Sequence, residues 1–210
     1  MNQNHEKIKF KNGEILPLMD TFTTIQGEGF HSGRSAHFLR IGGCDIGCHW
    51  CDIKESWNSD LYPLVKIENI LETVNSSVDI IVISGGEPLI WNMSPLTSSL
   101  KKLNKKIHLE TSGAYEISGN WDWICLSPKK NKLPISGIYK KANELKVIIY
   151  NKHDLLFAEE NAKKVEKNCN LFLQPEWSKK EIVMPLINKF ILENPNWRLS
   201  LQIHKYLGIK

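Results

Sequence analysis

Three cysteines within eight residues constrain this chain more than any other feature of its sequence. Cys44, Cys48 and Cys51 form the spacing Cys-x3-Cys-x2-Cys in the segment GGCDIGCHWCD. A structural zinc site usually takes four ligands, whereas disulfides pair cysteines two by two. Three thiolates so close together therefore predict a metal centre in which one coordination position stays open.

Cysteine thiolates bind iron–sulfur clusters, and a cubane cluster contains four irons. Three cysteines leave one of these irons without a protein ligand and free to bind a small molecule. Two alternatives stay open at this point. One is a zinc ion held by the three cysteines and His49, although His49 directly follows Cys48 in the chain. The other is three plain thiols.

Length and charge favour one domain and a small-molecule ligand. The 210 residues fit a single domain spanning 1–210. The net charge is +4, from 27 basic and 23 acidic residues, which is too mild to indicate nucleic-acid binding. The lysine-rich segments 101–106 and 129–132 are interpreted as solvated surface, apart from Lys129, which belongs to a polar motif after a strand.

The sequence predicts neither secretion nor a membrane span. Residues 1–17 contain no apolar core of the kind that secretory signals carry. No run approaches the roughly 18 apolar residues of a membrane helix. We therefore expect a cytoplasmic protein whose five cysteines stay reduced and free to bind metal. Cys125 and Cys169 stand apart from the other three and are predicted to be buried thiols.

Short apolar runs alternate with helical patterns along the chain, which predicts an α/β fold. Several runs are continuously apolar, as expected for parallel strands covered on both faces. Strands are expected at 36–42, 79–84, 107–111, 123–127, 145–150, 171–174 and 199–204, with 18–26 as a further edge strand. Helices are expected at 67–74, from Ser94 as N-cap through Leu103, at 154–165 and at 178–193. The crossovers 112–120 and 128–143 are too irregular for full helices, so the predicted fold is a partial TIM-like barrel of mostly parallel strands.

Distinctive polar motifs follow six of the predicted strands. In a parallel α/β fold the carboxyl ends of the strands form one rim, where active sites lie. We therefore expect these motifs to meet at one site. They are the cysteine segment, Gly85-Gly86-Glu87-Pro88, Thr111-Ser112-Gly113, Ser127-Pro128-Lys129, Gln174-Pro175-Glu176 and His204-Lys205.

The cysteine spacing, with Trp50 directly before the last cysteine, resembles the radical S-adenosylmethionine (SAM) superfamily. The resemblance implies a 4Fe–4S cluster on Cys44, Cys48 and Cys51 whose open iron binds SAM. It also implies a 5′-deoxyadenosyl radical that abstracts hydrogen from the substrate. The segment SGGEP supports it, because this motif binds the amino group of the cofactor in the superfamily. Cofactor contacts are predicted for Trp50, Asp52, Gly85, Gly86, Glu87, Ser112, Ser127, Pro128, Lys129, Gln174, Pro175, Glu176 and Trp177.

A second resemblance is narrower. Residues 21–52 are similar to the start of the 7-carboxy-7-deazaguanine synthase family. The segments IQGEG, FLRIGGC, SGGEP, SPK, LQPEW and LQIHK follow in family order over nearly the whole chain. This resemblance implies a radical ring contraction in which 6-carboxy-5,6,7,8-tetrahydropterin loses ammonia. The product would be 7-carboxy-7-deazaguanine, on the 7-deazapurine pathway to queuosine.

By the same resemblance, a set of residues at the rim is expected to bind the pterin. These are Ile25, Gln26, Gly27, Arg40, Ser84, His204 and Lys210. Arg40 is assigned to the substrate carboxylate, for which a guanidinium is suited, and a structural salt bridge is the alternative. The resemblance also implies a homodimer and an electron donor such as flavodoxin or ferredoxin.

One residue departs from the family pattern. The family often has threonine directly after Cys-Asp, where its hydroxyl helps to bind Mg²⁺ beside the substrate, but this chain has Ile53. Isoleucine carries no ligand atom, and Mg²⁺ prefers octahedral oxygen coordination. We therefore expect weak or absent stimulation of turnover by Mg²⁺.

Two other functions share part of this pattern. A short radical enzyme that installs a glycyl radical on a partner protein needs the cysteines and GGEP, but it has no need for IQGEG or LQIHK. A zinc-bound interaction module without enzymatic activity is the second. The sequence favours the pterin enzyme over both.

Overall fold

The computed structural model of this chain describes residues 12–210. Residues 1–11, part of the segment in which no secretory signal is predicted, lie outside the described residues. Within the described range nine strands form one open sheet in the order β3-β1-β2-β4-β5-β6-β7-β8-β9. They are β1 (Ile15–Ile25), β2 (Ser35–Ile41), β3 (Leu64–Lys66), β4 (Ile80–Gly85), β5 (Lys106–Thr111), β6 (Trp123–Leu126), β7 (Glu144–Ile149), β8 (Asn170–Pro175) and β9 (Trp197–Leu199).

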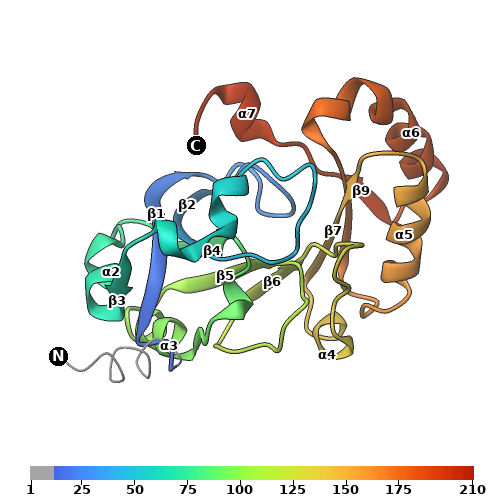
Figure 1. The fold of residues 1–210 in the computed structure, drawn as a ribbon. Helices are drawn as coiled ribbons and strands as arrows, with labels where there is room; N and C mark the ends of the chain where they lie inside the picture. Colours follow the sequence, from blue (N-terminus) through green and yellow to red (C-terminus); the bar gives the residue numbers. More distant parts are fainter. Residues whose placement is uncertain (1–11) are drawn as a thin grey trace.

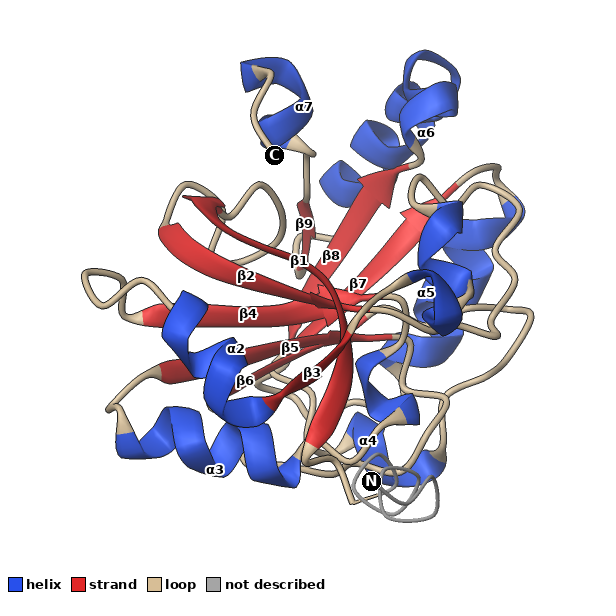
Figure 2. Ribbon diagram, turned by 60° about the vertical axis from the view of Figure 1, so that its left-hand side comes forward, coloured by secondary structure: helices blue, strands red, loops and turns tan. Residues whose placement is uncertain are grey.

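The sheet is parallel from β2 to β9, and β1 runs antiparallel to both of its neighbours. Figure 2 shows that the sheet is curved rather than flat. In residues 12–210 its two edges, β3 and β9, do not pair with each other. These features confirm the predicted partial barrel of mostly parallel strands.

Helices flank this sheet in the connections between strands. Figure 1 shows α2 and α3 at one end of the sheet, α5 and α6 at the other, and α7 apart from them above β1 and β2. Their bounds are α2 (Ile67–Thr73), α3 (Ser94–Lys102), α4 (Ser136–Tyr139), α5 (His153–Ala162), α6 (Lys180–Glu193) and α7 (Ile203–Leu207). Short 3-10 turns lie at Lys54–Trp57, Ser59–Leu61, Pro88–Ile90 and Trp177–Lys179.

Each parallel strand divides its side chains between a core face and a cavity face, because successive side chains point to opposite sides of a sheet. In β4, Ile81 and Ile83 are fully buried in the core shared with the helices, whereas Ser84 lines a cavity. In β7, Val147 is in that core and Lys146 lines the cavity. The predicted burial of both strand faces is confirmed for β4, in which Ile81 and Ile83 pack in the core beside the helices and Ile80 and Val82 belong to a second buried cluster.

The first six predicted parallel strands agree with the structure to within one residue at each end. The seventh, expected at 199–204, is wrong beyond Leu199. Ser200 still bonds to β8, through its N–H to Leu173 O at 2.9 Å and its Oγ to Gln174 Oε1 at 2.8 Å. The chain then leaves the sheet, and Gln202 Nε2 donates to Glu28 Oε1 at 2.8 Å. His204 consequently lies in the short helix α7 rather than at a strand end.

Smaller differences concern edges and caps. The strand expected at 18–26 is β1, which begins earlier, at Ile15; β3 pairs only with Ile15 to Pro17, so the expected stretch pairs with β2 alone in the sheet, as an edge strand does. Ser94 is the first helical residue rather than the N-cap, and its hydroxyl accepts from Gly119 N at 3.2 Å. Leu103 does not continue the buried face of α3, since it is 49% exposed. The expectation of irregular crossovers is confirmed, with only the four-residue α4 in 128–143.

The division between core and surface predicts different costs for the same substitution. Ile83 has 0% exposure, whereas Ile182 on α6 is 67% exposed. Ile83→Ala should lower the free energy of unfolding by about 2–5 kcal/mol, because it removes buried methyl groups and leaves a cavity. Ile182→Ala should cost less than about 0.5 kcal/mol. Urea unfolding followed by circular dichroism measures both, and equal costs would contradict the assigned core.

Candidate active site

A cavity of about 450 Å³ opens at the carboxyl ends of the parallel strands. Its volume is typical of small-molecule sites. The residues predicted from the sequence gather on its wall, with one exception: Pro128 is buried and does not reach it. The lining includes Ile25, Gln26, Gly27, Arg40, Cys44, Cys48, Trp50, Cys51, Asp52, Ser84, Gly85, Gly86, Glu87, Ser112, Ser127, Lys129, Gln174, Pro175, Glu176, Trp177, His204 and Lys210.

The three cysteines lie on the loop that follows β2, and backbone hydrogen bonds fix its course. Cys44 N donates to Trp57 O at 3.1 Å, and Cys51 N donates to Cys48 O at 3.0 Å. All three thiols are free and half-buried, and all three line the cavity. The loop therefore presents three unpaired sulfurs to one space.

The electrostatics of this loop oppose three thiolates unless a cation accompanies them. Burial raises the pKa of Cys44 to about 11, and the Glu87 carboxylate and the other two cysteines act in the same direction. Burial also raises the pKa of Cys48. Bound iron offsets this cost, because a coordinating thiol loses its proton outright. The donor set thus fits a metal centre.

Geometry bears on the choice between a cluster and a single zinc ion. In residues 12–210 no three His, Cys, Asp or Glu side chains converge on one point, as a tetrahedral ion requires. In a cubane each thiolate binds a different iron, so a cluster does not require the three cysteines that line this cavity to converge on one point. His49, the fourth ligand of the zinc alternative, packs edge-on against Tyr150 with 4.9 Å between ring centres.

The carboxylate of Glu87 organises the loops beside the cysteines. It is 1% exposed and accepts hydrogen bonds from Leu89 N, Thr111 Oγ1, Ser112 N and Ser112 Oγ at 2.5–3.1 Å. The N–H of Glu87 donates to Gly43 O at 2.9 Å. Glu87 therefore positions the wall of the cavity, and its direct contact with a cofactor stays a prediction.

Two close approaches in the site require glycine. A Cβ on Gly86 would lie 2.3 Å from Gly43 O, so only glycine lets the end of β4 pack against the cysteine loop. A Cβ on Gly27 would lie 2.1 Å from Nδ1 of His204, which keeps the C-terminal segment close to β1. Both glycines therefore bring separate chain segments together around the cavity.

Polar groups predicted to contact the cofactor are held by local hydrogen bonds. Lys129 Nζ donates to Ser127 O at 2.5 Å and to Ser127 Oγ at 2.7 Å, and it lies 5.6 Å from the centre of the Trp50 ring. Burial lowers the pKa of Lys129. The carboxylate of Glu176 accepts from Ser178 N at 3.1 Å and from Ser178 Oγ at 2.6 Å. These side chains are thus preorganised at the wall.

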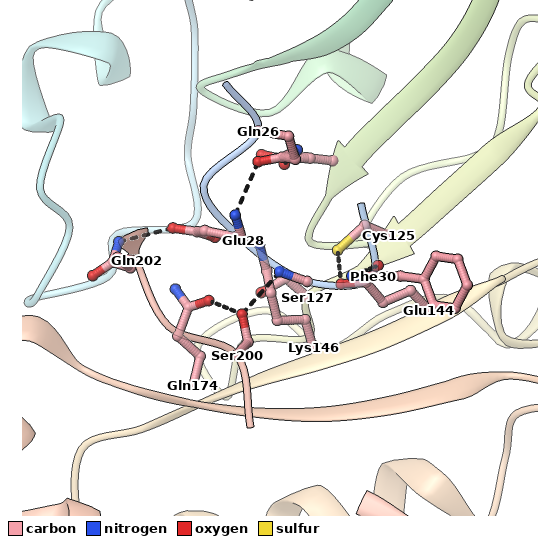
Figure 3. Close-up of polar contacts among 12 residues, drawn as sticks. Gln26, Glu28, Phe30, Cys125, Ser127, Glu144, Lys146, Gln174, Ser200 and Gln202 are labelled. Atoms are coloured by element: carbon pink, nitrogen blue, oxygen red, sulfur yellow. Dashed lines mark hydrogen bonds and ion pairs between the residues drawn. The ribbon is translucent and has the colours of Figure 1, made fainter. Parts of the chain in front are cut away.

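The strands also contribute charged side chains that were not predicted from the sequence. Lys146 on β7 forms an ion pair with Glu28, to which Gln202 also donates, and Figure 3 shows these residues together. Gln26 Nε2 donates to Glu110 Oε1 at 3.0 Å. The sequence did contain a signal for these contacts, because Glu110 and Lys146 are charged residues inside otherwise apolar strands.

Arg40 on β2 presents a guanidinium that no carboxylate of residues 12–210 pairs with. It lies over the Phe22 ring, 5.0 Å from its centre, and lines the cavity. A structural salt bridge, the alternative explanation for Arg40, is therefore not seen in this part of the chain. The guanidinium can pair with an anionic ligand.

The C-terminal segment closes one side of the cavity. Ile203 N donates to Gly27 O at 3.0 Å, which ties the start of α7 to the residues after β1. Lys210 Nζ forms an ion pair with Asp20 at 2.8 Å. His204 and Lys210 both line the cavity from this segment, as predicted from the sequence.

Known proteins resemble this chain over nearly its whole length. A model of the Radical SAM superfamily matches residues 39–118. The 7-carboxy-7-deazaguanine synthase of Flavobacterium psychrophilum is 60% identical over 203 residues, which cover 97% of each chain. The Synechocystis enzyme of that name is 46% identical over 92% of this chain and 93% of the relative. The crystal structure of QueE from Escherichia coli has a TM-score of 0.81 at 29% identity, covering 93% of this chain and 97% of that one.

No helix in residues 12–210 is long and apolar enough to cross a membrane.

The hydrogen bonds to Glu87 predict a loss of stability on amide substitution. In Glu87→Gln an NH₂ group replaces one acceptor oxygen and leaves buried donors unpaired, so the free energy of unfolding should fall by about 1–3 kcal/mol. Glu193→Gln is the matched control, because the Glu193 side chain is 61% exposed, and it should change stability by less than about 0.5 kcal/mol. Urea unfolding distinguishes the two, and a neutral Glu87→Gln would contradict the assigned network.

The Glu28–Lys146 pair predicts a dependence of stability on pH. Burial alone raises the pKa of Glu28, but the charge and hydrogen bond of Lys146 outweigh it and lower the pKa from 4.5 to about 2. Because the folded-state pKa is the lower one, this contribution is present above about pH 4.5 and is lost as the pH falls toward about 2. The stability advantage of the wild type over Glu28→Gln should therefore shrink across that interval. A difference that acid does not change would refute the pair.

Proposed function

The chain belongs to the 7-carboxy-7-deazaguanine synthase family and is a radical SAM enzyme, and on this premise we propose its substrate and the roles of its residues. The substrate is 6-carboxy-5,6,7,8-tetrahydropterin, which is converted to 7-carboxy-7-deazaguanine with loss of ammonia. The membership of both families that the sequence resemblances implied is confirmed. One observation carries the proposal: the cysteine loop and a polar wall that bears Arg40 face the same cavity.

The cysteine side of the cavity takes the cofactors. When bound, the 4Fe–4S cluster and SAM supply a 5′-deoxyadenosyl radical that abstracts hydrogen from the pterin. Cys44, Cys48 and Cys51 would hold the cluster. Gly85 and Gly86 let a ligand approach the backbone closely, and the preorganised Lys129 ammonium suits a carboxylate.

The opposite side takes the pterin. The free guanidinium of Arg40 suits the substrate carboxylate, which it can bind through two parallel hydrogen bonds. Glu28, Glu110 and the amide of Gln26 offer acceptors to the N–H groups along the pyrimidine edge of a pterin. His204 and Lys210 close the space and exclude water from the reacting centre.

Mg²⁺ does not fit the wall where the resemblance places it. The side chain of Ile53 has no ligand atom, and its carbonyl oxygen already accepts from Ser56 N at 3.0 Å and from Ser56 Oγ at 2.7 Å. The adjacent Asp52 carboxylate forms an ion pair with Lys205. A hard cation that needs six oxygen ligands thus finds little protein anchorage. We propose that turnover does not require Mg²⁺.

Other features remain proposals that rest on the resemblance and the composition. The cluster needs an electron, for which we propose a small carrier such as flavodoxin or ferredoxin. We propose a homodimer in the cytoplasm, where the five free thiols stay reduced. A net charge of +4 gives no support to a nucleic-acid partner.

An anaerobic assay tests the reaction. The enzyme with reconstituted cluster, reductant, SAM and the pterin should yield 5′-deoxyadenosine and 7-carboxy-7-deazaguanine, detected by mass spectrometry. Cys48→Ala should abolish both products. Cys169→Ala is the matched control, because Cys169 is buried away from the cavity, and it should retain both. Arg40→Ala should lower kcat/KM for the pterin at least roughly tenfold by removing a charge-assisted contact.

The products also separate the rival functions. Formation of 5′-deoxyadenosine without the deazaguanine would preserve the radical chemistry and reject the pterin as substrate, as expected for an enzyme that activates a partner protein. Formation of neither product by a protein that contains zinc would reject the cluster.

A further inference from the structure

Lys205 and Asp52 form an ion pair at the cavity wall that has no role in the reaction as proposed above. Lys205 Nζ donates to Asp52 Oδ2 at 2.9 Å, and both residues line the cavity. The Lys205 side chain is 21% exposed, against 56% for Asp52. Lys205 is therefore the better-buried partner of the pair.

Contacts on both sides of Lys205 in the chain hold the ammonium in place. Lys205 Nζ lies 5.1 Å from the centre of the Trp177 ring. The next residue, Tyr206, meets the same ring edge-on with 5.1 Å between ring centres. An ammonium has three N–H donors. In residues 12–210 one of them goes to Asp52, so two remain for oxygen atoms of a ligand in the cavity.

We propose that the Lys205 ammonium binds the anionic oxygens of the pterin. Its positive charge takes the place of a divalent ion at this wall of the cavity. The inference rests on the proposed function, because it concerns the same substrate in the same cavity. Ile53 leaves the wall without an oxygen ligand beside Asp52, and Asp52 is paired with the ammonium. The cation at this position is thus a side chain of the protein.

A structural latch is the competing explanation, since Lys205 joins α7 to the cysteine loop. The two explanations differ in what restores activity after Lys205 is lost. A free divalent ion does not rebuild a latch, but it can replace a missing charge once the wall offers it a ligand. Ile53→Thr provides such a ligand, because it introduces a hydroxyl next to Asp52.

The kinetic test compares the wild type with Lys205→Gln, Lys205→Arg and the double variant Ile53→Thr/Lys205→Gln. Lys205→Gln should raise KM for the pterin roughly tenfold, the worth of one charge-assisted hydrogen bond. Lys205→Arg should recover most of that loss. The double variant should gain saturable stimulation by millimolar Mg²⁺, which the wild type should lack.

A matched control separates the cavity from the aromatic cluster beside it. Lys180 also packs on Trp177, with Nζ 3.8 Å from the ring centre, but it does not line the cavity. Lys180→Gln should therefore keep the wild-type KM. An equal rise of KM in Lys180→Gln and Lys205→Gln would indicate that both variants only loosen α7, and it would overturn the proposal.

Mn²⁺ binding, followed by electron paramagnetic resonance in the presence of the pterin, examines the wall without turnover. The double variant should bind Mn²⁺. The wild type and Ile53→Thr alone should not, because the ammonium is still present. If Lys205→Gln fails to fold, Ile53→Thr alone still tests the proposal, because it keeps every contact of Lys205: Mn²⁺ bound by this single variant would overturn the proposal.

Three further results would overturn the proposal: Mn²⁺ bound by the wild type, severalfold stimulation of the wild type by Mg²⁺, or an unchanged KM in folded Lys205→Gln. Failure of the proposed function looks different. The wild type would then release 5′-deoxyadenosine and no 7-carboxy-7-deazaguanine at any Mg²⁺ concentration, and the role of Lys205 would be rejected with it.

Discussion

One buried carboxylate holds together the loops that surround the three cysteines. Glu87 accepts hydrogen bonds from Leu89, Thr111 and Ser112 while its N–H donates to Gly43, directly before the first cysteine. A buried ionised group is tolerated only when such partners surround it. The loops after β4 and β5 and the cysteine loop are therefore fixed relative to one another. The wall of the cavity around the cysteines is held in place by the same contacts.

The opposite side of the cavity depends on the alternation of side chains along the parallel strands. One set packs into the core beneath the helices, and the other set meets across the curved inner face. Glu110 and Lys146 belong to this second set, as do Arg40 and Ser84. Charges in the middle of a sheet are costly unless they are paired or needed by a ligand. Lys146 has Glu28 as its partner, whereas the Arg40 guanidinium has no carboxylate partner in residues 12–210.

The cavity is closed by a segment that is far away in the sequence. Residues after β9 return to the end of β1 and to the loop that holds the cysteines, through Ile203, Lys205 and Lys210. The Lys205–Asp52 contact joins this segment to the residue directly after the last cysteine. The C-terminal segment and the cysteine loop are thus physically connected. The Lys205 ammonium lies where they meet.

The sequence by itself determined the loop that carries the three cysteines, the parallel strands and the rim on which the motifs meet. These features are local: Cys44, Cys48 and Cys51 lie within one loop, and apolar runs of strand length identify β2 and β4 to β8. Only the tertiary structure decided the rest. The residues expected in a seventh strand leave the sheet after Ser200, where Gln202 bonds to Glu28 and Ile203 bonds to Gly27. The pairing of Glu28 with Lys146 and of Asp52 with Lys205 joins residues more than 100 positions apart. No local pattern encodes such contacts, because they exist only once the curved sheet has brought these distant segments together.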